Sequence, residues 1–199
     1  MTCATYADLL RPAQRPYTLL YDLGLIVGGS LLIGLMAQVA IPLPFTPVPI
    51  TGQTLAVLLA GALLGSRRGA LCILTYLAEG FAGLPVFAGG TAGISRLLGP
   101  TGGYLVGYLV AAYLVGWLAE KGWDRKLWTN FTAMVMGNSA IYLFGVSWLA
   151  IALGWQEALV AGMYPFIPGD LIKIAIATGL LPLGWKFLRD PSATPSGDR

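Results

Sequence analysis

Long apolar runs with very few charged residues constrain this chain more than any other feature. Only 11% of its 199 residues are charged, whereas 56% are hydrophobic. A soluble domain carries roughly 25% charged residues, because its surface must be hydrated. A chain with so few charges lacks the residues for such a surface, so lipid is its expected solvent. We therefore expect an all-α integral membrane protein.

Glycine, proline and charged residues divide the chain into six apolar segments. A helix needs about 20 apolar residues to cross the roughly 30 Å hydrocarbon layer. The segments predict transmembrane helices over residues 19–40, 51–65, 69–81, 104–119, 131–153 and 168–188. The second and third are short for a full span, which indicates that their outer ends stop around a cavity. We expect one six-helix membrane domain, residues 17–189, between an N-terminal segment 1–16 and a flexible tail 190–199.

Basic residues indicate the orientation of this domain. An even number of spans places both termini on one side, together with ten of the twelve Lys and Arg residues. These ten are Arg11, Arg15, Arg67, Arg68, Lys121, Arg125, Lys126, Lys186, Arg189 and Arg199. Cytoplasmic loops are enriched in Lys and Arg, so both termini are expected in the cytoplasm. The N-terminal segment is too polar for a cleavable signal, so the first helix is expected to stay in the mature protein. We expect a multi-pass protein of the inner (cytoplasmic) cell membrane in contact with lipid.

Several function classes are excluded by what the sequence lacks. It has no histidine, the commonest general base and metal ligand. Cys3 and Cys72 have no metal-binding spacing, and no phosphate-binding loop motif occurs. The net charge of +3 is too small to suggest nucleic acid. We expect no metal, no cofactor, no nucleic-acid partner and no ATP hydrolysis by this chain itself.

Five charged residues lie outside the cytoplasmic ends: Glu79, Arg96, Glu157, Asp170 and Lys173. A charge at membrane depth costs at least about 2.5 kcal/mol, so each is a functional candidate. Asp170 and Lys173 are three residues apart and share one helical face. They form either an ion pair that only lets the helix enter the membrane, or a donor–acceptor site for a neutral ligand. We favour the ligand site.

The other three charges have competing interpretations. Arg96 is either a solvated loop cation or a fork for a carboxylate arriving from outside. Glu79 ends a short helix, where the helix dipole disfavours negative charge, so a partner is implied: Arg96 or a ligand donor. Glu157 fits an ordinary interfacial residue.

Uncharged polar and small residues supply further candidates. Gln53 and Asn138 interrupt apolar segments, either as interhelical hydrogen-bond partners or as ligand contacts. Small residues four apart occur in the first expected helix at Gly24 and Gly28, and at Ser30 and Gly34, so this helix is a candidate docking face for another helix. The glycine-rich loop 80–103 has the freedom to fold tightly over a site.

Five short motifs follow one another along the chain: residues 41–44 (IPLP), 48–54 (VPITGQT), 83–90 (GLPVFAGG), 99–105 (GPTGGYL) and 168–173 (PGDLIK). In this order and spacing they resemble the BioY family, the biotin-binding S components of energy-coupling factor (ECF) transporters. The resemblance covers residues 38–173. It implies a six-helix S-component fold with biotin near the outer face under a lid, here residues 42–49. It also implies a complex with an EcfT-type transmembrane coupling protein and two cytoplasmic ATPases. Ser30 and Gly34 occupy the place of two alanines in the family's docking motif.

The resemblance also suggests which residues meet biotin, the transported ligand. The ureido ring has two N–H donors and one C=O acceptor, so Asp170 can accept, Lys173 can donate, and Gln53 or Asn138 can do either. Arg96 is the expected partner of the carboxylate. The same implication makes Tyr142 and Tyr164 wall residues, and makes Glu79 a second ureido acceptor or the partner of Arg96.

The leading hypothesis is a high-affinity biotin-uptake subunit without enzymatic activity. An alternative is an intramembrane hydrolase that uses Glu79 and Asp170 as paired carboxylates. Such a pair needs one strongly raised pKa, and a lysine beside Asp170 argues against it.

Overall fold

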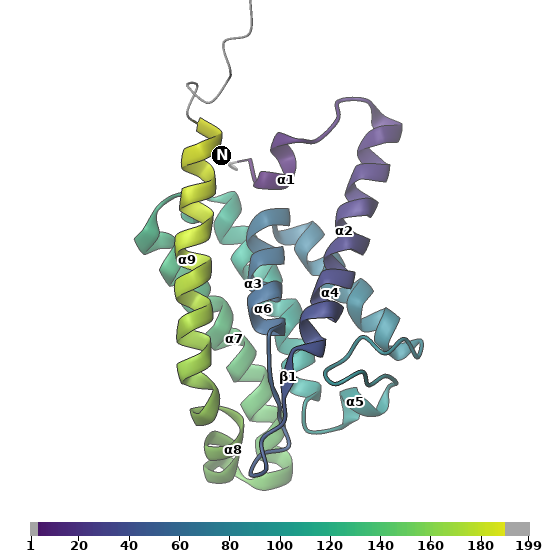
Figure 1. Ribbon diagram of the computed structural model, residues 1–199, viewed down its shortest axis with the longest axis vertical. Helices are drawn as coiled ribbons and strands as arrows, with labels where there is room; N and C mark the ends of the chain where they lie inside the picture. The colour runs from purple at the N-terminus through teal and green to yellow at the C-terminus, as the bar shows by residue number, and fades with distance from the viewer. Residues whose placement is uncertain (1–3, 190–199) are drawn as a thin grey trace, which may run out of the picture.

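The computed structural model describes residues 4–189, which form a bundle of helices (Figure 1). The longer helices are α2 (Arg15–Gln38), α3 (Gln53–Leu64), α4 (Ser66–Phe81), α6 (Gly102–Glu120), α7 (Leu127–Leu153) and α9 (Ile167–Arg189). The short elements are α1 (Tyr6–Leu9), α5 (Ser95–Leu98), η1 (Trp123–Arg125), α8 (Trp155–Gly162) and η2 (Tyr164–Phe166). The helical fold is confirmed, and each of the six apolar segments forms a helix. The expected tail 190–199 lies outside the described residues.

Four helical stretches of residues 4–189 are long and apolar enough to cross a membrane: Pro16–Gln38, Gly102–Glu120, Leu127–Leu153 and Trp155–Leu188. The last of these runs through α8, η2 and α9. Helix α3 is apolar but shorter. Both ends of the described chain lie at the same end of the bundle, the upper end in Figure 1.

Helix α6 packs in the centre of the bundle through small residues, which allow helices in a membrane to approach closely. A side chain at Gly61 of α3 would meet the Ala112 backbone, with the built Cβ only 2.5 Å from its carbonyl oxygen. Gly116 lies equally close to the Gly65–Ser66 backbone at the corner between α3 and α4. Gly65 makes this corner possible, because its φ of 86° is disfavoured for other residues.

The proline-rich segment after α2 forms a β-hairpin, which the apolar segments of the sequence did not predict. Strands β1 (Ala40–Ile41) and β2 (Ile50–Thr51) pair antiparallel, with Ala40 opposite Thr51. Residues 42–49 join them, and the prolines there exclude a helix. Thr46 Oγ1 donates a hydrogen bond of 2.6 Å to the carbonyl of Ala161, which joins the hairpin to α8. The hairpin descends to α8 at the end of the bundle opposite the termini (Figure 1).

Helix α9 contains Pro182, which lacks an N–H and leaves the Thr178 carbonyl without its helical donor. Asn130 of α7 supplies the missing donor. Its Nδ2 lies 3.0 Å from the carbonyl oxygen of Ala177 and 3.1 Å from that of Thr178. Asn130 is fully buried, so this contact stabilises the proline-interrupted turn without water.

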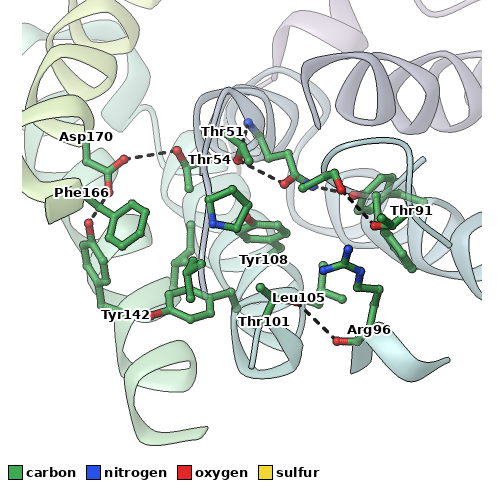
Figure 2. Close-up of a pocket in the computed structure, with 18 of the residues that line it drawn as sticks. Thr51, Thr54, Thr91, Arg96, Thr101, Leu105, Tyr108, Tyr142, Phe166 and Asp170 are labelled. Atoms are coloured by element: carbon green, nitrogen blue, oxygen red, sulfur yellow. Dashed lines mark hydrogen bonds between the residues drawn. The ribbon is translucent and has the colours of Figure 1, made fainter. Parts of the chain in front are cut away.

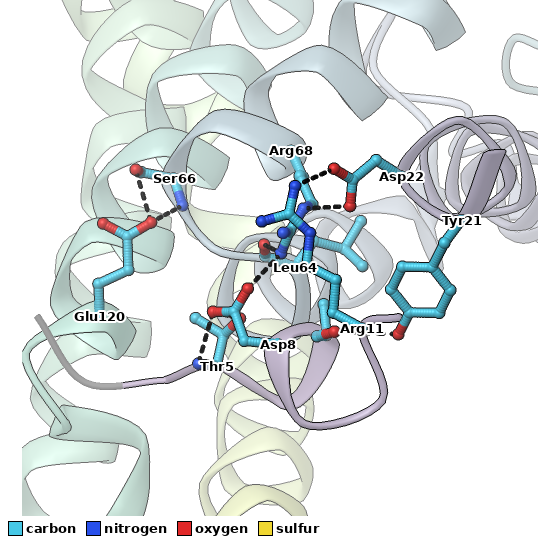
Figure 3. Close-up of polar contacts among 10 residues, drawn as sticks. Thr5, Asp8, Arg11, Tyr21, Asp22, Leu64, Ser66, Arg68 and Glu120 are labelled. Atoms are coloured by element: carbon cyan, nitrogen blue, oxygen red, sulfur yellow. Dashed lines mark hydrogen bonds and ion pairs between the residues drawn. The ribbon is translucent and has the colours of Figure 1, made fainter. Parts of the chain in front are cut away.

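Charged residues join α1, α2 and α4 at the end that carries the termini (Figure 3). Arg68 of α4 bonds to Asp8 at 2.8 Å and to Asp22 of α2 at 2.9 Å. Arg11 bonds to the other oxygen of Asp22 at 2.6 Å. The described part of the expected N-terminal segment is thus folded against the bundle rather than free of it. The polar composition alone did not indicate this contact.

Glu120, the last residue of α6, lies at the start of α4. Its Oε1 accepts hydrogen bonds from the backbone N–H of Ser66 at 2.7 Å and from the Ser66 hydroxyl at 2.8 Å (Figure 3). A carboxylate is stabilised at a helix N-terminus by the free N–H groups and the positive end of the helix dipole.

The attachment of α1 is expected to weaken in acid. Burial opposes ionisation of Asp8, but hydrogen bonds from Thr5 and Arg68 outweigh it and hold the pKa of Asp8 below its ordinary value of 3.8. A lowered carboxyl pKa contributes stability above the unfolded value, which is lost as the pH falls through the folded one. The contribution is about 0.2–1 kcal/mol, because the ion pair is partly exposed.

Hydrogen-exchange protection factors of residues 4–10 measure this attachment. In the wild type they should be constant between neutral pH and pH 5. They should decrease once the pH is well under 4. Asp8→Asn should show lower protection at neutral pH and little further change in acid. A pH dependence that is identical in the two proteins would contradict the role of Asp8.

Candidate ligand-binding site

A cavity lies among α3, α6, α7 and α9, and the hairpin and the glycine-rich loop complete its wall. Its apolar and aromatic lining includes Val48, Pro49, Phe87, Tyr104, Leu105, Tyr108, Ile141 and Phe166. The cavity volume is about 60 Å³. A single water needs about 10–15 Å³ by this measure, so the cavity holds more than isolated water. Aromatic walls with a few polar groups are typical of small-molecule sites.

Asp170 of α9 is the centre of a polar cluster at one side of this cavity. Its Oδ1 lies 3.0 Å from Lys173 Nζ and accepts from Thr54 Oγ1 at 3.4 Å. Its Oδ2 accepts from Asn138 Nδ2 at 3.3 Å and from the Tyr142 hydroxyl. Lys173 Nζ also donates to Thr54 Oγ1 at 2.8 Å. Groups from α3, α7 and α9 therefore hold a buried ion pair at the edge of the cavity.

A second polar cluster is formed where β2 leads into α3. Gln53 is buried and donates from Nε2 to the Tyr76 hydroxyl at 2.5 Å. Its Oε1 accepts from Thr51 Oγ1 at 3.1 Å. All three residues line the cavity. The cluster presents both donor and acceptor groups to a ligand.

Arg96 of α5 lines the same cavity from the other side. Figure 2 shows Asp170 and Arg96 apart, with Tyr108 and Leu105 between them. Within the described part of the chain, no side chain forms an ion pair with Arg96. A cavity with an ion pair at one side and a free guanidinium at the other suits an elongated ligand that is neutral at one end and anionic at the other.

Six of the eight residues expected to contact the ligand meet at this cavity. Gln53, Arg96, Tyr142, Asp170 and Lys173 line it. Asn138 reaches it through its hydrogen bond to Asp170.

Two of the expected ligand contacts lie elsewhere. Tyr164 is in η2, 54% exposed, and does not line the cavity. Glu79 accepts a hydrogen bond from Ser30 Oγ at 2.9 Å instead of pairing with Arg96. Sequence spacing predicts which face of a helix a residue occupies, but not which neighbouring helix that face meets.

The sequence did not single out Thr54, Tyr76 or Phe87 as site residues. Thr54 follows Gln53 at the start of an apolar helix, and this pair of polar residues could have identified Thr54 as a site residue. No sequence pattern identified Tyr76 or Phe87, because single aromatic residues are common in membrane helices and their loops.

The four residues expected to form a docking face divide into two pairs. Gly24 and Gly28 are exposed, with no atom within 4 Å of a built Cβ. Ser30 is fully buried against Glu79, and Gly34 packs against Val86. The second pair therefore contacts this chain's own α4 and following loop, so in this conformation it presents no free surface.

A solved structure has the same fold. The crystal structure of the S-component for biotin from an ECF-type ABC transporter superposes with a TM-score of 0.75, at 27% identity, over 87% of this chain and 95% of that one. Together with the apolar helices and the aromatic cavity, this fold defines the class: a helical membrane transport protein with the S-component fold.

Sequence relatives specify the class further. Biotin transporter BioY of Rhizobium etli is 39% identical over 157 residues, which cover 74% of this chain and 83% of the relative. Biotin transporter BioY2 of Lactococcus lactis is 39% identical over 163 residues, covering 81% and 88%. Residues 11–190 match the BioY family, and the chain belongs to it.

The hydrolase alternative is not supported. It required Glu79 and Asp170 to act as a pair, but Glu79 bonds to Ser30 and Asp170 to Lys173. The family that the chain belongs to is one of transporters rather than enzymes.

Proposed function

We propose that this chain captures biotin outside the cell and delivers it inward as the membrane subunit of a vitamin transporter. The biotin transporters among its relatives support this assignment. The observation that carries it is the cavity itself, which places the Asp170–Lys173 pair and Arg96 on opposite sides of an aromatic wall. Biotin has the matching groups: a ureido ring, an apolar thioether ring and a carboxylate tail.

In the proposed complex, the ureido ring lies beside Asp170 and Lys173, with Gln53 and Asn138 as further hydrogen-bonding groups. Because both oxygens of Asp170 already accept hydrogen bonds, a ureido N–H must replace or share one of these donors. Lys173 then has a proton to donate to the ureido oxygen.

The carboxylate lies on Arg96, and Tyr142 forms part of the wall. The hairpin connection, residues 42–49, is the proposed lid, because Val48 and Pro49 line the cavity.

The proposed topology has six spans in the inner cell membrane, with both termini in the cytoplasm. Its support is the charged cluster of Arg68 and Arg11 at the end of the bundle where both ends of the described chain lie (Figure 1).

The proposed partners are an EcfT-type coupling protein and two cytoplasmic ATPases. The proposed contact is the exposed face of α2 around Gly24 and Gly28.

Mass spectrometry of the purified full-length protein tests the ligand directly. Biotin at about one molecule per chain is the expected result. Protein that carries none, and that shows no heat of binding when biotin is added, would exclude the assignment. Desthiobiotin and lipoate serve as comparison ligands, since the first keeps the ureido group and the second does not.

Arg96→Gln should weaken biotin binding about 10- to 150-fold, because a hydrogen bond to a charged group contributes roughly 1.5–3 kcal/mol. The matched ligand is biotin methyl ester, which keeps the ring system and lacks the negative charge. Wild type and variant should bind the ester with similar affinity in isothermal titration. An equal loss for both ligands would show that Arg96 does not meet the carboxylate.

A further inference from the structure

The turn between α6 and α7 brings together tryptophans and basic residues that the ligand cavity does not use. Residues 117–128 (WLAEKGWDRKLW) contain three tryptophans, three basic residues and two acids. Gly122 adopts a φ of 81°, which allows α6 to end and η1 to follow directly. Arg125 Nη2 donates to the Ala4 carbonyl at 3.1 Å, so the turn lies at the end of the bundle that carries the N-terminus of the described chain. Its surface charge depends on which of these side chains face outward.

Both acids of the turn face the protein. Glu120 accepts two hydrogen bonds from Ser66 at the start of α4. Asp124 is 2% exposed and accepts a hydrogen bond from Trp185 Nε1 of α9. Arg125 also faces inward, with its guanidinium carbon 4.6 Å from the centre of the Trp185 ring. The acids are therefore held against other helices and do not pair with the remaining basic residues of the turn.

Those remaining residues, Lys121 and Lys126, are exposed. Neither forms an ion pair within residues 4–189. Lys121 Nζ lies 3.6 Å from the centre of the Trp117 ring, which is a cation–π contact. The ring covers one side of the ammonium group, and the N–H groups on its other side can donate to an acceptor outside the protein. The turn thus presents two cations, one of which is held in place by an aromatic ring.

Exposed tryptophans beside these lysines indicate that the acceptor belongs to a lipid. Trp117 is 41% exposed and Trp128, in the first turn of α7, is 84% exposed. Tryptophan is enriched where the hydrocarbon of a membrane meets water, because its ring is apolar and its N–H is polar. A lysine at the same depth extends its ammonium group to the level of the lipid phosphates. An acidic protein segment would need only the lysines, whereas a phospholipid can use both kinds of side chain.

We propose that the α6–α7 turn is a binding site for an anionic phospholipid. Lys121 and Lys126 bind the phosphate group, and Trp117 and Trp128 contact the apolar part of the lipid. A zwitterionic lipid carries its own ammonium group beside the phosphate, so it should bind less tightly. Because Trp117 already holds Lys121, less side-chain entropy is lost when the lipid binds. This site is separate from the ligand cavity and does not depend on the proposed function.

Native mass spectrometry of the full-length protein, titrated in detergent with phosphatidylglycerol or phosphatidylcholine, tests the site. The wild type should bind its first phosphatidylglycerol more tightly than its first phosphatidylcholine. Replacing Lys121 and Lys126 together with glutamine should weaken phosphatidylglycerol binding by about five-fold for each lysine, the attraction of one basic residue to an anionic lipid surface. Binding of phosphatidylcholine should change much less.

The matched control replaces Arg67 and Lys186 with glutamine. Both are exposed and outside the turn, and the change in net charge is the same. This variant should keep the wild-type affinity for phosphatidylglycerol. An equal loss in the two double variants would show that the lipid responds only to net charge, and an unchanged affinity in the Lys121 and Lys126 variant would show that the turn does not bind it. Either result would overturn the proposal.

Trp117→Leu tests the aromatic part of the site, because it keeps both lysines and the net charge. Lys121 must then be ordered when the lipid binds, so the affinity for phosphatidylglycerol should fall about two- to five-fold. An unchanged affinity would contradict the role of Trp117. None of these measurements requires biotin.

Discussion

Replacing Lys173 with methionine is expected to lower the free energy of unfolding by about 3 kcal/mol and to abolish retention of biotin. Removing one partner of a buried ion pair costs roughly 3–5 kcal/mol, because the other charge stays buried without compensation. The side chain of Lys173 is 17% exposed and that of Asp170 is 7% exposed. We expect the lower end of the range, since Thr54, Asn138 and Tyr142 still donate to Asp170.

A double variant separates stability from binding. Asp170→Asn together with Lys173→Met removes both charges, so it should recover most of the lost stability. It should still fail to bind biotin, since the strong donor and the strong acceptor are both gone. Chemical unfolding in detergent and titration with biotin measure the two effects. Wild-type binding by the double variant would show that the pair serves only to stabilise the fold.

Replacing Gly116 with alanine should destabilise the bundle by about 1–3 kcal/mol, the range for an overpacked core. A Cβ at this position lies 2.5 Å from the Gly65 carbonyl carbon and the Ser66 nitrogen. Both are backbone atoms, so no side chain can rotate away. The corner they belong to is held by the φ of Gly65 and by the hydrogen bonds from Ser66 to Glu120.

The matched control is Gly179→Ala in α9, where no atom lies within 4 Å of the added carbon. Its unfolding temperature should equal or slightly exceed that of the wild type, because alanine is the better helix former. If the two variants unfold alike, α6 and the corner between α3 and α4 do not approach as closely as described.

The sequence predicted the six long helices because a long apolar segment has few alternatives to a helix in lipid. It did not predict α1, α8 or the hairpin. The pairing of Ala40 with Thr51 depends on two strands meeting across a proline-rich connection. The position of α1 depends on the contact of Arg68 with Asp8, and neither contact leaves a periodic signal in the sequence.

Charge was an effective guide to the site. Asp170, Lys173 and Arg96, which were selected because a charge at membrane depth is costly, line one cavity. The same reasoning selected Glu79 and implied a partner, Arg96 or a ligand donor, but it did not identify Ser30 of α2, which donates to Glu79 in the structure. The free-energy cost of a charge in a membrane indicates that the residue has a role, but only its contacts in the folded structure show which role.

Under the proposal that residues 42–49 form a lid, the hydrogen bond from Thr46 to the Ala161 carbonyl has a kinetic consequence. It holds the hairpin closed through contacts that the cavity does not share, so it stabilises the closed state equally with and without ligand. Entry and exit must both wait for the same opening. Such a contact slows association and dissociation by a common factor and leaves the equilibrium affinity nearly unchanged. The residence time of a captured molecule is therefore set in part by a threonine that never touches it.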